Sequence, residues 1–211
     1  RFAQMDDLQF SFGSMGFQDQ AKHVATMYLE DLGDFIKENI DEHFGFSRYA
    51  ERLGRSANSF DTLYELLQQP LSLIDTITIE KLEAHIAAIQ PALVALSVPF
   101  PGNLFSSLRC AQYIKKNHPH IKVAMGGGFA NTELRSVKDI RVFEFYDFIT
   151  LDDGEKPLEQ LLLFIDGNIS SDELKRCLLI ENGEVVYKNN KNCADYKMAD
   201  TGTPDYSDLP L

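Results

Sequence analysis

The sequence predicts an α/β fold in which a mainly parallel sheet is connected by crossover helices. The prediction rests on three apolar segments, 92–98, 121–125 and 145–151, each followed by a polar or glycine-containing loop and then by a helical pattern. Strand, loop and helix repeated at this pace build a parallel sheet with crossover helices. Ligands of such sheets bind beyond the carboxyl ends of the strands, so the three loops are the expected ligand surface.

The composition and net charge of the chain limit its class and its partners. Of its 211 residues, 44% are hydrophobic and 25% are charged, which is typical of an ordinary soluble globular protein. The net charge of −12 repels phosphate backbones, so we do not expect nucleic acid as a partner. No apolar run approaches the roughly 20 residues that a membrane helix needs, and neither end resembles a secretory signal. A membrane is therefore not expected as a partner either.

Three cysteines, Cys110, Cys177 and Cys193, show neither close pairing nor the spacing of metal ligands. We expect them to be free thiols of a protein in the reducing cytoplasm. The acidic turn at 152–155 is more typical of a helix start than of a metal site, and the histidines show no H-E-x-x-H motif. The sequence therefore predicts no metal ligand and no catalytic residue.

The N-terminal part of the chain is expected to be mainly helical. Apolar residues recur at steps of three and four between residues 24 and 36, which predicts an amphipathic helix. A second helical pattern covers 60–67 and stops at Pro70, and a third covers 79–90 and is closed by Pro91.

The loops that follow the three strands carry residues able to begin helices. The first strand, 92–98, is a nearly continuous apolar run, as expected for a strand buried on both faces. Asn103 and Asn131 are predicted to cap the helices that follow the first and second strands. Asp152 with Glu155 forms a capping-box pattern at the start of the next helix.

The C-terminal part is predicted to contain a β-hairpin at 178–187, because Asn182-Gly183 favours a tight primed turn. From Asn189 the chain is polar, and residues 204–211 have the composition of a linker. The expected organisation is a mainly helical segment 1–75, an α/β domain 76–170, and a hairpin with linker 171–211.

The run Gly126-Gly127-Gly128 is the strongest local signal for a ligand. Without Cβ atoms its backbone can approach a ligand closely, and its N–H groups suit a phosphate or a polar nucleotide edge. A tight strand-to-helix turn with no ligand explains the run equally well. The run fits neither G-x-G-x-x-G nor a loop ending Gly-Lys-Ser/Thr, so a dinucleotide or triphosphate site is not indicated.

Three motifs in this part of the chain are together similar to a known family. Segments 91–100, 125–128 and 146–155 read Pro-Ala-Leu-Val-Ala-Leu-Ser-Val-Pro-Phe, Met-Gly-Gly-Gly and Tyr-Asp-Phe-Ile-Thr-Leu-Asp-Asp-Gly-Glu. In this order and spacing they resemble the cobalamin (vitamin B12)-binding N-terminal domain of radical SAM enzymes, a family of Fe-S oxidoreductases. The stretch 128–135 is similar to one branch of that family, and the resemblance covers roughly residues 75–170.

The resemblance implies a flavodoxin-like (Rossmann-like) domain with a corrinoid lying across the carboxyl ends of the strands. It implies that cobalamin would be bordered by Ser97, Val98, Pro99, Asn103, Gly126, Gly127, Gly128, Gly154 and Glu155. The chain contains neither the Asp-x-His-x-x-Gly motif of a histidine cobalt ligand nor the CxxxCxxC motif of an iron–sulfur cluster. The resemblance therefore assigns S-adenosylmethionine, the [4Fe-4S] cluster and catalysis to a radical SAM domain that follows this chain.

We therefore expect a cobalamin-binding accessory domain of a radical SAM enzyme, for example one of the methyltransferase type. Two other functions stay open: a structural or interaction domain that has lost the cofactor, and an α/β enzyme that binds a nucleotide-sugar or another phosphorylated ligand. The family's first strand–helix–strand unit is not recognisable before Asp6. An incomplete sheet would leave an exposed edge and invite a homodimer through strand pairing.

Overall fold

The computed structural model describes residues 17–46, 60–203 and 205–207. The strands are β1 (Leu93–Ser97), β2 (Lys122–Gly126), β3 (Phe148–Thr150), β4 (Cys177–Glu181) and β5 (Glu184–Lys188). The helices are α2 (Phe17–Asn39), α4 (Asp61–Leu67), α5 (Leu73–Ile89), α6 (Pro101–Asn117), α7 (Gly128–Glu133) and α8 (Glu155–Ile165), with short 3₁₀ helices η2 (Ile140–Glu144), η3 (Ser171–Glu173) and η4 (Met198–Asp200).

The five strands form one sheet in the order β1-β2-β3-β4-β5. The pairs β1–β2 and β2–β3 are parallel, whereas β3–β4 and β4–β5 are antiparallel. The predicted α/β fold with a parallel sheet and crossover helices is thus confirmed for the first three strands. The hairpin that the sequence places after the α/β unit continues the same sheet. Its turn residues Asn182 and Gly183 have φ of 53° and 82°, as the predicted primed turn requires.

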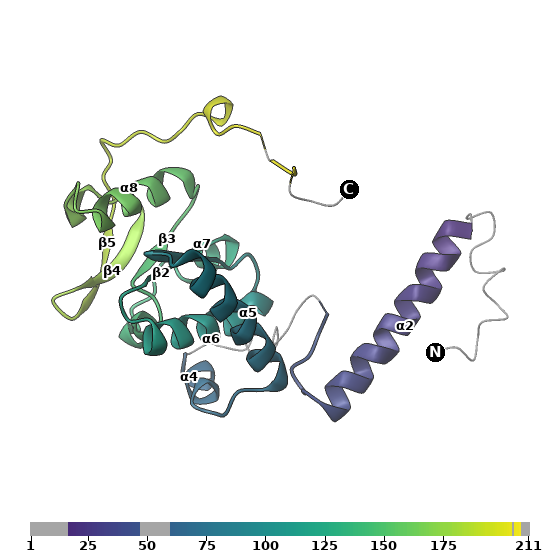
Figure 1. Cartoon of the computed structure of the whole chain (residues 1–211). Coiled ribbons are helices and arrows are strands. Elements are labelled where there is room, and N and C mark those ends of the chain that lie inside the picture. Colours follow the sequence, from purple (N-terminus) through teal and green to yellow (C-terminus); the bar gives the residue numbers. More distant parts are fainter. Residues whose placement is uncertain (1–16, 47–59, 204, 208–211) are drawn as a thin grey trace.

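Helices cover the two faces of the sheet unequally (Figure 1). Because neighbouring residues of a strand point to opposite faces, Val123 and Met125 of β2 face one side and Ala124 faces the other. The first side packs against α4, α5 and α6 in the larger core, whose members include Leu63, Ile86, Leu108, Val123, Met125 and Ile149. The second side packs against α8 in a smaller core of Ala124, Phe148, Leu161, Leu174, Cys177 and Leu179.

Strand β1 lies at the edge of the sheet, and the prediction that it is buried on both faces was wrong. Its residues Ala95 and Ser97 are exposed. They lie on the same face as Ala124, and α8 covers this face at the neighbouring strands β2 and β3. An edge strand has a neighbour on one flank only, so side chains on its thinly covered face stay accessible to solvent. The apolar composition of β1 reflects packing against α6 rather than burial on both sides.

The three predicted N-terminal helices are present as α2, α4 and α5. The starts of α5 and α6 differ from the sequence prediction. Helix α5 begins earlier, at Leu73, because Ser72 and Asp75 form a capping box that satisfies its first N–H groups. The boundary expected at residue 75 therefore falls inside α5. Helix α6 begins at Pro101, whose ring fixes φ for a helix start, so Asn103 lies in the first turn and is not its N-cap.

Helix α2 stands apart from the α/β body (Figure 1). Its apolar residues Leu29, Leu32 and Phe35 are about half exposed, at 51%, 48% and 58%. Among the helices that the structure describes, none combines the length and the apolar character needed to cross a bilayer. Most of the linker expected at 204–211 lies outside the described residues.

Candidate functional site

A cavity of about 350 Å³ opens at the carboxyl ends of β1, β2 and β3, on the side of the sheet that α8 covers. Its volume is near the lower end of the range found for small-molecule pockets. Small side chains make up most of its floor, because Ala95, Ser97, Ala124 and Gly126 lie side by side in register on that face. The cavity is lined by Ala95, Leu96, Ser97, Ala124, Met125, Gly126, Gly127, Thr150, Gly154, Glu155 and Leu158.

The cavity brings together part of the set of residues expected to bind the cofactor. The members that line it are Ser97, Gly126, Gly127, Gly154 and Glu155. The remaining four lie behind or beside the cavity. Val98 is fully buried and its carbonyl accepts a hydrogen bond from the N–H of Phe129 at 3.0 Å. Pro99 and Gly128 face each other across the two loops, and Asn103 is exposed on α6.

Gly127 and Gly128 are glycines because the chain packs against itself there. A Cβ atom on Gly127 would lie 2.8 Å from the carbonyl carbon and oxygen of Val98, and its φ is 102°. A Cβ atom on Gly128 would lie 2.9 Å from the carbonyl oxygen of Pro99. The β2–α7 loop can therefore contact the β1–α6 loop only without side chains at these positions. Internal packing is a sufficient reason for both residues, with or without a ligand.

Gly126 and Gly154 both line the cavity, but they differ in the space around them. A Cβ atom on Gly126 would lie 3.0 Å from the Thr150 hydroxyl, so even one carbon would crowd the floor. Gly154 has φ of −78°, which any residue adopts, and a Cβ atom there would meet no atom within 4 Å. Neither backbone conformation nor packing requires glycine at 154. A ligand that approaches the loop closely would require it.

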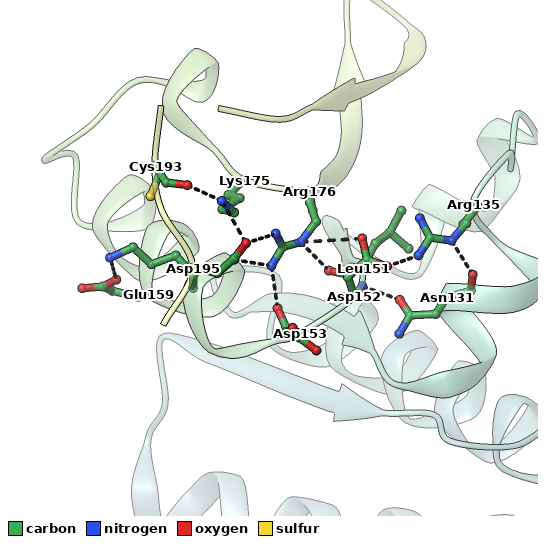
Figure 2. A network of polar contacts seen from close by, with 11 residues as sticks. Asn131, Arg135, Leu151, Asp152, Asp153, Glu159, Lys175, Arg176, Cys193 and Asp195 are labelled. Carbon is green, nitrogen blue, oxygen red and sulfur yellow. Dashed lines mark hydrogen bonds and ion pairs between the residues drawn. The ribbon is translucent and has the colours of Figure 1, made fainter. Parts of the chain in front are cut away.

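The β3–α8 loop that carries Gly154 is held by a polar network from neighbouring loops (Figure 2). The Oδ1 atom of Asn131 accepts a hydrogen bond from the N–H of Asp152 at 2.5 Å, and Arg135 forms an ion pair with the Asp152 carboxylate. Asp152 has φ of 61°, so it lies outside the helix, and α8 starts after Gly154 without a side-chain cap. The predictions that Asn131 and Asp152 are helix caps were therefore wrong. Both side chains fix the loop instead.

Arg176, which precedes β4, holds the same loop from the opposite side. Its Nε donates to the carbonyl of Leu151 at 3.3 Å, and its Nη2 donates to the carbonyl of Asp153 at 3.0 Å. Both Nη atoms also donate to the carboxylate of Asp195, at 2.9 and 2.7 Å. This bidentate pair, with Lys175 as a second cation, lowers the pKa of Asp195 from 3.8 to about 2.

Sequence reasoning missed Lys175, Arg176 and Asp195. The one local signal was the adjacent pair of cations directly before an apolar strand in an acidic chain. Their partners lie far away in the sequence, since Leu151 is 25 residues from Arg176. A pattern read over a few residues could not connect them.

The lining of the cavity is mainly apolar. Glu155 is the one charged residue in the lining, and the Thr150 hydroxyl donates to the carbonyl of Met125 at 3.3 Å. The carboxylate of Glu155 disfavours a phosphate close to it and favours a neutral group or a hydrogen-bond donor. The remaining polar side chain of the lining is the hydroxyl of Ser97.

Comparison of the chain with protein-family models, with curated proteins and with solved structures found no match. Within the residues that the structure describes, no group of three or more histidine, cysteine, aspartate or glutamate residues is placed to hold a metal ion. The three cysteines are free thiols, and Cys110 and Cys177 are buried. The functional assignment therefore depends on the geometry of the cavity together with the sequence motifs.

Proposed function

We propose that this chain is a cobalamin-binding accessory domain and that the cavity holds the flat, apolar end of the cofactor's nucleotide tail. The observation that carries the proposal is the apolar cavity at the carboxyl ends of β1–β3, with small residues on its floor and an unobstructed Gly154 on its rim. At about 350 Å³ the cavity suits one flat ring system, so the corrin macrocycle would lie outside it. When bound, cobalamin supplies a cobalt centre that can carry a methyl group.

The residues present in the cavity fit such a group. Ala95, Ser97 and Gly126 provide a floor without large side chains, and Gly154 and Glu155 border the opening. In this proposal the chain's own residues bind the tail, orient it along the strand ends and exclude water from its apolar face. Internal packing accounts for Gly127 and Gly128, so we assign them a supporting role behind the floor.

The cavity favours this function over an enzyme that binds a phosphorylated ligand. Such an enzyme would need anion-binding groups at the strand ends, but the charged group in the lining is the carboxylate of Glu155. The cations nearest this edge, Arg135 and Arg176, are already paired with Asp152 and Asp195. If the chain does not bind cobalamin, the remaining interpretation is a structural domain without a cofactor.

The proposal is tested by titrating the purified chain with hydroxocobalamin and recording the absorption spectrum of the corrinoid. We expect a saturable spectral change with the wild-type chain. Gly154→Leu adds a large side chain at the rim without demanding a strained backbone, so it should weaken binding of a tail that approaches this loop closely at least about tenfold. Ala88→Leu, an exposed change on α5, is the matched control and should bind like the wild type. An unchanged spectrum with the folded wild-type chain would exclude direct binding.

The wider assignment extends beyond the residues of this chain. By the family resemblance, we propose that the radical SAM domain, with its S-adenosylmethionine and [4Fe-4S] cluster, lies outside this sequence, which carries no CxxxCxxC motif. Three free thiols support a reducing compartment, and we place the protein in the cytoplasm. Reading the gene beyond Leu211 tests the assignment, since a cysteine triplet of that spacing is expected there.

A further inference from the structure

The first half of the C-terminal segment 189–203, residues 190–196, lies against the residues that lead into β4. The N–H of Asn190 donates to the carbonyl of Leu174 at 2.9 Å, and Nζ of Lys175 donates to the carbonyl of Cys193. Further along, Asp195 pairs with Lys175 at 3.3 Å and with Arg176 at 2.7 Å. The segment is therefore attached to the residues that lead into β4 by backbone and by charged contacts.

Arg176 connects this segment to the rim of the cavity (Figure 2). One side of its guanidinium binds the carboxylate of Asp195, and its other donors bind the carbonyls of Leu151 and Asp153. Only 12% of the Arg176 side chain is exposed, so water cannot easily replace these partners. Gly154, on the rim of the cavity, directly follows Asp153. A shift of Asp195 would therefore be transmitted to the rim through one rigid side chain.

A second contact reaches the first turn of α8. Nζ of Lys156 lies 4.8 Å from the centre of the Tyr196 ring, and the same ammonium group pairs with Glu159. Lys156 follows Glu155, the charged residue of the cavity lining. Two neighbouring residues of the segment thus reach both ends of the short stretch that forms the rim: Asp195 through Arg176, and Tyr196 through its direct contact with Lys156.

We propose that segment 189–203 is a strap that is coupled to the rim of the cavity, with Asp195 as the positioning residue. Asp195 holds Arg176 in the place where it fixes the 151–155 loop, so docking of the strap shapes the rim of the cavity. Coupling between two sites is reciprocal, and a ligand that fits this rim therefore stabilises the docked strap. This second part rests on the proposed function of the cavity.

The role of Asp195 is tested first without any ligand, by hydrogen exchange of the backbone amides measured by mass spectrometry. Asp195→Asn keeps the shape of the side chain but removes its charge. We expect exchange in residues 151–156 to become at least about tenfold faster, which corresponds to the loss of a charge-assisted hydrogen bond. Asp200→Asn, in the same segment and without a cation partner recorded among the described residues, should leave this exchange unchanged. Unchanged exchange at 151–156 in Asp195→Asn would overturn the proposal.

A double-mutant cycle separates positioning through Arg176 from a general loosening of the fold. Arg176→Lys cannot hold the carboxylate and both carbonyls at once, because lysine lacks the planar fork of arginine. If Asp195 acts through Arg176, adding Asp195→Asn to Arg176→Lys will change the exchange at 151–156 no further. Additive effects of the two substitutions would contradict the mechanism.

Hydroxocobalamin then serves as the probe of coupling. In the wild-type chain it should slow amide exchange in residues 190–200, and Asp195→Asn should bind it about tenfold more weakly. If hydroxocobalamin binds but leaves the strap unchanged, the coupling is overturned while the proposed function stands. If it does not bind at all, the proposed function and the coupling both fall, and the ligand-free experiment still decides whether Asp195 positions the loop.

Discussion

Gly127 and Gly154 show at the residue scale that two glycines at one sheet edge serve different purposes. Gly127 has a positive φ and would bring a Cβ atom to 2.8 Å from the Val98 backbone. Gly154 has an ordinary φ and open space around it. A substitution at Gly127 therefore changes the stability of the fold, whereas a substitution at Gly154 reports on the cavity.

We predict that Gly127→Ala lowers the free energy of unfolding by at least about 2 kcal/mol, through an unfavourable φ combined with a backbone clash. Gly154→Ala should change it by no more than about 0.5 kcal/mol. Urea denaturation followed by circular dichroism measures both. Equal stabilities of the two variants would show that the two loops do not pack as described. The same difference makes Gly154 the suitable position for testing ligand binding.

At the scale of elements, a single side chain joins three helices. Arg109 of α6 donates to the carbonyls of Leu66 and Leu67 at the end of α4, at 3.0 and 2.8 Å. Its Nε lies 3.1 Å from a carboxylate oxygen of Asp75 in the first turn of α5, close enough for an ion pair but not aligned as a hydrogen bond. Arg109 and Asp75 are 4% and 3% exposed. The pair therefore satisfies the orphan carbonyls of one helix and fixes the start of the next.

Arg109→Met should lower the free energy of unfolding by about 3–5 kcal/mol, because it leaves Asp75 as a buried charge without its partner. Adding Asp75→Leu should recover part of this loss, since the unpaired charge is then removed. Lys116→Met, an exposed change on the same helix, is the control and should stay within about 0.5 kcal/mol of the wild type. Urea denaturation of the wild type, the two single variants and the double variant measures these free energies of unfolding. A small effect of Arg109→Met would mean that the Arg109–Asp75 pair contributes little to stability.

At the scale of the whole molecule, β1 is an edge strand: among the residues that the structure describes, no strand pairs with its outer flank. Val98 donates to Gly126 and Ala92 accepts from Lys122, so the even-numbered residues of this strand bond to β2. By alternation, the N–H and carbonyl of Ala95 point away from β2, toward the open edge. Such an edge is a template for strand pairing between two copies of the chain.

We predict that the chain forms a concentration-dependent dimer and that Ala95→Pro prevents it. Proline removes an outward-pointing N–H and keeps the bonds to β2, so the fold should persist. Ala95→Val, which keeps the N–H and favours strands, is the matched control and should still dimerise. Size-exclusion chromatography with light scattering gives the masses. A wild-type chain that stays monomeric at every concentration, or a dimeric Ala95→Pro, would contradict pairing through this edge.

Much of the α/β unit could be predicted because its signals are local. Apolar segments separated by helical patterns predicted the first three strands and their parallel pairing, and Asn182-Gly183 predicted the hairpin turn. The cap predictions failed where another interaction competed. Pro101 already starts α6. Asn131 lies within α7 and its side chain accepts a hydrogen bond from the Asp152 N–H, and the Asp152 carboxylate pairs with Arg135. Five of the nine residues expected at the cofactor line the cavity.

The sequence by itself determined the type of fold and the loops that follow the first three strands, because periodicity and turn chemistry act over a few neighbouring residues. Only the tertiary structure decided that Gly127 is required by packing whereas Gly154 has open space around it, and that β1 lies at the edge of the sheet. It also decided the partners of Arg109 and Arg176, which lie 42 and 25 residues away at Leu67 and Leu151. Such contacts exist only once the chain has folded, since many buried carbonyls could accept the same guanidinium and packing selects among them.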